Sequence, residues 1–132
     1  MHARTIEGGF QPDAAGWLRL FEAIDRRDAR AFAQFLTSDA SFRFGNAPPI
    51  AGTDAIEAAV AGFFALLAGC QHRLLQHWAG EGTAVCEGEV TYTTPHGKTV
   101  TVPFVNVFEL RADRIASYRI YIDNAPLFAA LA

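Results

Sequence analysis

The sequence predicts an α+β fold in a single domain. Three helical segments come first along the chain and four strands follow them, an order that is typical of α+β proteins and differs from alternating βαβ units. With 132 residues, the chain is long enough for one hydrophobic core and too short for two. Apolar residues make up 51% of it and charged residues 19%, a balance that excludes disorder.

Apolar residues recur every three or four positions in the segments expected to be helical. The first helix is expected to begin after an N-cap at Asp13. Its apolar positions are Trp17, Leu18, Phe21 and Ile24. A shorter helix is predicted over about residues 28–36. The third is expected to be capped by Thr53-Asp54 and stopped by Gly69.

Two further segments are predicted to be irregular. Residues 1–11 are expected to form a loose N-terminal arm. Residues 45–52 hold two prolines between glycines, which interrupt regular structure. A short strand is predicted over residues 40–44, and a short turn over residues 126–131.

Four strands are predicted over about residues 70–79, 83–93, 99–110 and 114–123, separated by turn-forming residues. Turns at 95–98 and 112–113 set a register in which Phe104 lies opposite both Glu89 and Tyr121. Side chains alternate along a strand, so these three residues share one face. The same face is expected to carry His72, Trp78, Glu87, Val102, Asn106, Arg119 and Asp123.

Two carboxylates on this face are the candidate acid–base groups. In the predicted register, Glu89 and Asp123 lie close together with no arginine between them, whereas Glu87 has Arg119 as a partner. If the helices cover the face, the two carboxylates are enclosed and their pKa values are raised and separated, which suits general acid–base catalysis. His72 falls close to them.

A partner subunit is expected on the opposite face of the sheet. Neither face of the sheet has the composition of a solvent-exposed surface, and three helices can cover only one of the two faces. The economical arrangement is therefore a homodimer through the sheet.

Several other classes of partner are excluded by charge and composition. The net charge is -3 and the basic residues are scattered, so we expect no nucleic acid partner. Neither a signal region nor a membrane-spanning run is present, so we expect no membrane partner and a cytoplasmic location. The two cysteines, Cys70 and Cys86, are expected to be free thiols.

No cofactor is predicted either. His72, Glu89 and Asp123 do not have the spacing of a metal-ligand motif, so we expect no metal. The chain also has no glycine-rich phosphate-binding motif.

Five short segments carry a resemblance to a known family. They are Phe42-Arg43-Phe44-Gly45-Asn46, Gly52-Thr53-Asp54-Ala55-Ile56, Gly97-Lys98, Val107-Phe108-Glu109-Leu110 and Tyr118-Arg119-Ile120-Tyr121-Ile122-Asp123. In element order, spacing and length, the chain from about Asp13 resembles the nuclear transport factor 2-like superfamily. It is most similar to the SnoaL-like branch, which includes polyketide cyclases, limonene epoxide hydrolase and ketosteroid isomerases.

The resemblance implies a cone in which the helices pack over a curved, mostly antiparallel sheet, with an apolar pocket at the wide end and dimerisation through the sheet. It also implies a catalytic role for Asp123, which matches the aspartate that closes the last strand of relatives. The Arg-Xaa-Asp of the epoxide hydrolases reads Glu87-Gly88-Glu89 here, and Phe42 and Phe44 replace its water-binding residues. An isomerase or cyclase is therefore favoured over a hydrolase.

Two functions remain open. In the first, a cofactor-independent enzyme acts on a small, hydrophobic, oxygenated substrate: Asp123 or Glu89 takes a proton, while Tyr121 and His72 hydrogen-bond the developing oxyanion. In the second, the fold is a non-catalytic module that binds a small ligand or only dimerises. The residues expected to line the pocket are Trp17, Phe42, Phe44, Asn46, Trp78, Val102, Phe104, Asn106 and Arg119.

Overall fold

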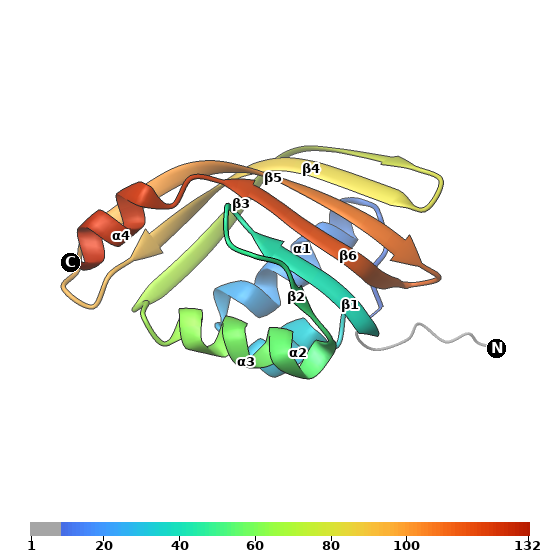
Figure 1. The fold of residues 1–132 in the computed structure, drawn as a ribbon. Helices are drawn as coiled ribbons and strands as arrows, with labels where there is room; N and C mark the ends of the chain where they lie inside the picture. Colours follow the sequence, from blue (N-terminus) through green and yellow to red (C-terminus); the bar gives the residue numbers. More distant parts are fainter. Residues whose placement is uncertain (1–8) are drawn as a thin grey trace.

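The computed structural model describes residues 9–132 and consists of four helices and one six-stranded sheet (Figure 1). The helices are α1 (Ala14–Asp25), α2 (Ala29–Ala33), α3 (Thr53–Phe64) and α4 (Ala125–Leu131). The strands are β1 (Leu36–Phe44), β2 (Ile50–Ala51), β3 (Gly69–Gly80), β4 (Thr83–Thr93), β5 (Thr99–Arg111) and β6 (Arg114–Ile122).

The sheet is curved, and α1, α2 and α3 lie on its concave side (Figure 1). Its strand order is β2-β1-β6-β5-β4-β3. Every neighbouring pair is antiparallel except β1 and β6, which are parallel. The predicted α+β fold is therefore confirmed. Within residues 9–132, no helix is long and apolar enough to cross a membrane.

The helix termini agree with the sequence at α1 and differ at α3. Asp13 is the N-cap of α1, and its carboxylate accepts a hydrogen bond from the Gly16 amide at 2.8 Å. The N-cap of α3 is Gly52, so the prediction that Thr53-Asp54 caps this helix is wrong. The Thr53 hydroxyl instead donates to the Thr37 carbonyl at 2.6 Å, which ties the start of α3 to β1. Gly69 begins β3 rather than stopping the helix.

The predicted register between β4 and β5 is wrong by one residue. Thr93 pairs with Thr99, so Phe104 lies opposite Gly88 instead of Glu89. The cause is a five-residue turn, in which the Thr94 amide donates to the Lys98 carbonyl at 2.8 Å. Because side chains alternate, this shift moves Glu87 and Glu89 to the outer, convex face of the sheet.

A second one-residue error affects β6. Leu110 pairs with Ile115 as predicted, but an irregularity between Glu109 and Leu110 then shifts the pairing. Phe104 consequently lies opposite Ile122, and Tyr121 pairs with Val105 on the outer face. The residues that face the helices from β4 and β6 include Cys86, Val90, Tyr92, Tyr118 and Ile120.

An aromatic cluster joins α1 to the centre of the sheet. The Trp17 ring lies 4.6 Å from that of Phe108 and 5.9 Å from that of Phe21, centroid to centroid. Phe10 packs on Trp17 at 5.0 Å and is 1% exposed. Of the loose arm expected over residues 1–11, residues 1–8 lie outside the described part of the chain, and Phe10 is part of the core.

Candidate functional site

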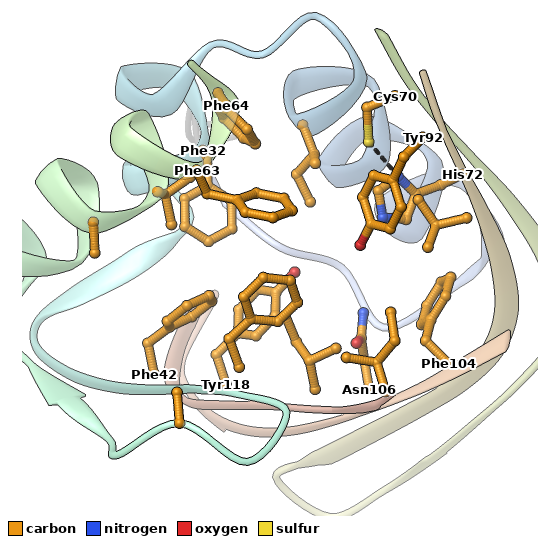
Figure 2. Close-up of a pocket in the computed structure, with 18 of the residues that line it drawn as sticks. Phe32, Phe42, Phe63, Phe64, Cys70, His72, Tyr92, Phe104, Asn106 and Tyr118 are labelled. Atoms are coloured by element: carbon orange, nitrogen blue, oxygen red, sulfur yellow. Dashed lines mark hydrogen bonds between the residues drawn. The ribbon is translucent and has the colours of Figure 1, made fainter. Parts of the chain in front are cut away.

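An apolar pocket lies between the helices and the concave face of the sheet (Figure 2). Its volume is about 180 Å³. An apolar cavity of about 150 Å³ holds a benzene molecule, so this pocket fits a molecule of one ring or little more. Its apolar lining includes Ile24, Phe32, Phe42, Phe44, Ile50, Phe63, Phe64, Val90, Phe104, Ile120 and Ile122.

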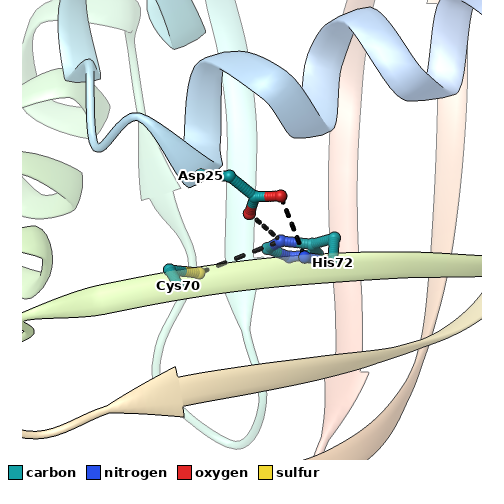
Figure 3. Close-up of side chains that lie close together, drawn as sticks. All are labelled: Asp25, Cys70 and His72. Atoms are coloured by element: carbon teal, nitrogen blue, oxygen red, sulfur yellow. Dashed lines mark hydrogen bonds and ion pairs between the residues drawn. The ribbon is translucent and has the colours of Figure 1, made fainter.

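One wall of the pocket carries a histidine held by a carboxylate. Asp25 is the last residue of α1, and its Oδ1 lies 2.6 Å from Nδ1 of His72 on β3. The other carboxylate oxygen, Oδ2, accepts the backbone N–H of His72 at 2.9 Å. The carboxylate therefore fixes both the ring and the strand that carries it (Figure 3).

Two aromatic side chains also hold the His72 ring. The Phe21 ring stacks on it at 4.8 Å, and Phe104 meets it edge to face at 5.3 Å. With Nδ1 bonded to Asp25, Nε2 is the ring nitrogen left to accept or donate a proton. His72 is therefore an oriented acid–base group at the wall of an apolar pocket.

Cys70 lies next to this pair, two residues before His72 on β3. Its Sγ is 3.9 Å from Nδ1 of His72 (Figure 3). Burial, and secondly the negative charge of Asp25, raise the pKa of the Cys70 thiol well above its ordinary value. At neutral pH the group is therefore a thiol and not a thiolate nucleophile.

Two tyrosine hydroxyls point into the pocket, from Tyr92 on β4 and Tyr118 on β6 (Figure 2). Burial is the main cause that raises the pKa of both phenols. Both hydroxyls therefore stay protonated and can donate a hydrogen bond to an oxygen atom of a ligand.

Asn106 on β5 adds an amide to the same lining. Its side chain is 3% exposed, and within the described residues its Oδ1 has no hydrogen-bond partner. A buried polar atom without a partner is costly, so this oxygen calls for a donor from an ordered water or a bound molecule.

Five of the residues predicted for the site line the pocket. They are His72, Phe42, Phe44, Phe104 and Asn106. Trp17 and Val102 are buried in the core instead, with Trp17 packed among aromatic rings. Trp78 on β3 is 51% exposed and Tyr121 on β6 is 58% exposed.

The two predicted carboxylates lie outside the pocket. Glu89 is on the outer face and forms an exposed ion pair with Arg73 at 3.4 Å. Asp123 is exposed, and it accepts a hydrogen bond from the Ala125 amide at 2.9 Å, where α4 begins. The two carboxylates therefore do not form the enclosed pair that the predicted register implied.

Arg119, Glu87 and Asn46 also lie elsewhere than expected. Arg119 pairs with Glu109 at 2.9 Å, and Glu87 accepts from the Gln76 amide at 2.6 Å, so the predicted Glu87–Arg119 pair is wrong. Asn46 is exposed and lies with Arg119 in a shallow surface hollow.

The sequence reasoning missed Asp25, Tyr92 and Tyr118. In the predicted register, which is wrong by one residue, both tyrosines fall on the face opposite to the candidate site. The position of Asp25 could have been recognised from the sequence. It follows Phe21 by four residues and so lies on the same side of α1 as the apolar residues. A carboxylate at such a position needs a partner in the fold.

The helix-covered curved sheet and its enclosed pocket define the nuclear transport factor 2-like class of proteins. Within that class, the model of the SnoaL-like domain matches residues 17–118, and the chain belongs to this family.

Solved structures agree in fold. The chain is similar to a putative SnoaL-like polyketide cyclase from Jannaschia sp. CCS1, with 18% identity, a TM-score of 0.78 and coverage of 99% of this chain and 97% of that one. It is also similar to an NTF2-like protein from Anabaena variabilis ATCC 29413, with 20% identity, a TM-score of 0.76 and coverage of 93% and 95%. TerC, crystallised with polyporic acid, matches with 16% identity, a TM-score of 0.76 and coverage of 92% and 98%.

Proposed function

We propose that the protein is an isomerase- or cyclase-type enzyme that moves a proton on a small, hydrophobic, oxygenated molecule bound in the pocket. The observation that carries the proposal is the 2.6 Å contact between Asp25 and His72 at the wall of a mostly apolar cavity. The carboxylate that acts is then Asp25, through His72, instead of Asp123 or Glu89.

The chemistry begins with His72 as the base. The neutral imidazole takes a proton from a carbon next to a carbonyl, and the electron pair of that C–H bond moves to the carbonyl oxygen as an enolate forms. The negative charge of Asp25 stabilises the imidazolium. His72 then returns the proton at another carbon, which gives an isomer. Alternatively, the enolate carbon attacks a second carbonyl of the same molecule, and His72 returns the proton to the resulting alkoxide, which gives a ring.

The enolate oxygen needs hydrogen-bond donors in a water-poor site. Tyr92 and Tyr118 supply two hydroxyl groups that point into the pocket (Figure 2). Because their pKa values are raised, they donate hydrogen bonds without losing their protons at neutral pH. The base therefore lies on β3, and the hydrogen-bond donors lie on β4 and β6. This arrangement supports a ketone or a related carbonyl compound as the substrate class.

Solvent deuterium exchange tests the proposal directly. The protein is incubated in D₂O with a panel of one- and two-ring cyclic ketones, and exchange at the carbon next to the carbonyl is followed by NMR. We expect His72→Gln to slow exchange by about 100-fold or more. Asp25 positions the base without touching the substrate, so Asp25→Asn should lower kcat and leave KM nearly unchanged.

Glu89→Gln is the matched control, because it also removes one carboxylate but on the outer face of the sheet. Its exchange rate should equal that of the parent protein. An exchange rate that persists in His72→Gln, or that falls in Glu89→Gln, would contradict the assignment. Ligand binding without exchange would favour the second candidate, a non-catalytic binding module, whose support is the almost wholly apolar lining of the pocket.

We also propose that the partner of this chain is a second copy bound through the outer face of the sheet. That face carries Trp78 and Tyr121, both more than half exposed, together with Val85, Val105 and Val107. Sedimentation should give a dimer for the parent protein and a monomer for a Trp78→Lys, Tyr121→Lys double variant. A parent protein that sediments as a monomer would rule the dimer out.

A further inference from the structure

Asp25, Cys70 and His72 form a group of three different ligand types in the pocket wall (Figure 3). One carboxylate oxygen, one sulfur and one ring nitrogen all lie within 4.8 Å of one another. Zinc prefers these donor types, and zinc sites that keep one position open take three ligands from the protein. The group therefore has the composition of an open zinc site.

The spacing of the donor atoms is close to that of a tetrahedral site. Bonds of about 2.0–2.3 Å place the donors of tetrahedral zinc about 3.3–3.7 Å apart. Sγ of Cys70 is already 3.9 Å from Nδ1 of His72. Oδ1 of Asp25, at 2.6 Å from Nδ1, has to withdraw by about 0.7 Å. A small rotation of the carboxylate at the C-terminal end of α1 supplies that movement.

Charge also favours a divalent ion. A carboxylate and a thiolate together neutralise a 2+ charge, which suits a poorly hydrated wall. Without a metal ion, burial and the negative charge of Asp25 raise the pKa of the Cys70 thiol. A cation reverses that influence, because a coordinating thiol gives up its proton, which passes to the solvent. The Arg27 guanidinium, bonded to the Ala68 carbonyl nearby, also favours the thiolate.

We propose that Asp25, Cys70 and His72 bind one thiophilic divalent cation, for which Zn²⁺ is the best match. Cys70 and His72 line the pocket, so the proposed ion lies in the wall of the cavity. The bound ion occupies Nδ1 of His72 and the carboxylate that orients it. Provided that the proposed function holds, the cation switches off proton transfer at His72.

Cadmium titration tests the site independently of activity. The sulfur-to-cadmium charge-transfer band in the ultraviolet reports a cadmium–thiolate bond. We expect the parent protein to reach a plateau at one Cd²⁺ per chain and to lose the band when Zn²⁺ is added. Cys70→Ser should abolish the band, and His72→Gln should weaken binding.

Cys86→Ala is the matched control, because Cys86 is the other free cysteine and lies on β4 outside the group. This variant should keep the band at the same stoichiometry, with circular dichroism confirming that each variant is folded. A parent protein without the band overturns the proposal. So does a band that survives Cys70→Ser or disappears in Cys86→Ala.

Deuterium exchange with and without Zn²⁺ tests the consequence for activity. Each variant is compared with itself, so a change in basal rate does not matter. The parent protein should lose most of its exchange in Zn²⁺, and Cys70→Ser should lose much less. If the parent shows no exchange with any ketone, the proposed function fails while the cadmium result still decides the metal site. Exchange that is unaffected by bound Zn²⁺ overturns the switch.

Discussion

At the scale of the residue, Asn106 combines a structural cost with a proposed role in binding. Its buried Oδ1 lacks a partner within the described residues. Replacing it with leucine, which has a similar volume, removes that cost. We expect Asn106→Leu to raise the free energy of unfolding by about 1 kcal/mol, measured by urea denaturation, while weakening the binding of ligands whose hydroxyl group can donate a hydrogen bond to Oδ1. A loss of about 1–3 kcal/mol would instead show that the amide is bonded in the folded protein.

Gly88, in contrast, is a residue whose identity the fold requires. A Cβ there would lie 2.5 Å from the Arg73 carbonyl oxygen and 2.7 Å from the Phe104 ring. Because Phe104 packs edge to face on His72, the absence of a side chain at 88 helps to hold the proposed base. We expect Gly88→Ala to lower the free energy of unfolding by about 2–3 kcal/mol. Gly80→Ala, whose Cβ would meet nothing within 4 Å, should be nearly neutral.

At the scale of the element, α1 delivers Asp25 to the pocket from a helix that is anchored at its other end. Asp13 caps its first turn at 2.8 Å, and Trp17 and Phe21 are buried along it. We expect Asp13→Ala to cost about 1 kcal/mol of unfolding free energy, and Asp13→Asn, which keeps the cap, to cost much less. Thermal unfolding followed by circular dichroism measures both. An equal loss in the two variants would contradict the capping role.

The first three helices and the four long strands were predictable from the sequence, whereas β2 and α4 fall in segments predicted to be irregular or a turn, and β1 begins four residues before the predicted strand. Glycine and proline mark the turns, so the predicted limits of the four long strands lie within one residue of those observed. Which side chains face the helices was less predictable, because a five-residue turn at 94–98 and an irregularity at Glu109 each change the strand register by one residue. As a result, Val90 lies on the inner face where Glu89 was predicted, and Ile120 lies there where Tyr121 was predicted. Of the site residues, His72, Asn106 and three phenylalanines were therefore predicted, whereas Asp25 and the two tyrosines were not.

At the scale of the whole molecule, buried thiol and phenol groups on the inner face of the sheet make the free energy of unfolding fall at high pH. Burial raises the pKa of the Cys86 thiol from 9.0 to about 12 and that of Tyr118 well above its usual value. The unfolded chain then loses these protons at lower pH than the folded chain does. Stability is therefore fully present below about pH 9 and falls as the pH rises from there toward 12.

Urea denaturation as a function of pH measures this loss. Each such group steepens the fall by up to about 1.4 kcal/mol per pH unit. We expect Cys86→Ala to have a shallower slope than the parent protein between pH 9 and 12, although the cavity it creates lowers its stability at every pH. Parallel curves for the two proteins would mean that Cys86 titrates alike in the folded and unfolded chain.

The parallel pairing of β1 with β6 determines when the pocket can form during folding. Tyr118 and Ile120 line the pocket from β6, and Phe42 and Phe44 line it from β1, yet the two strands stand more than seventy residues apart in the sequence. Contacts of such long range slow folding, because a large loop must close before they form. On the ribosome, β1 lacks this neighbour until β6 has been made. We therefore expect ligand binding to appear only with the last strand, and a chain released before it to expose the aromatic side chains of β1.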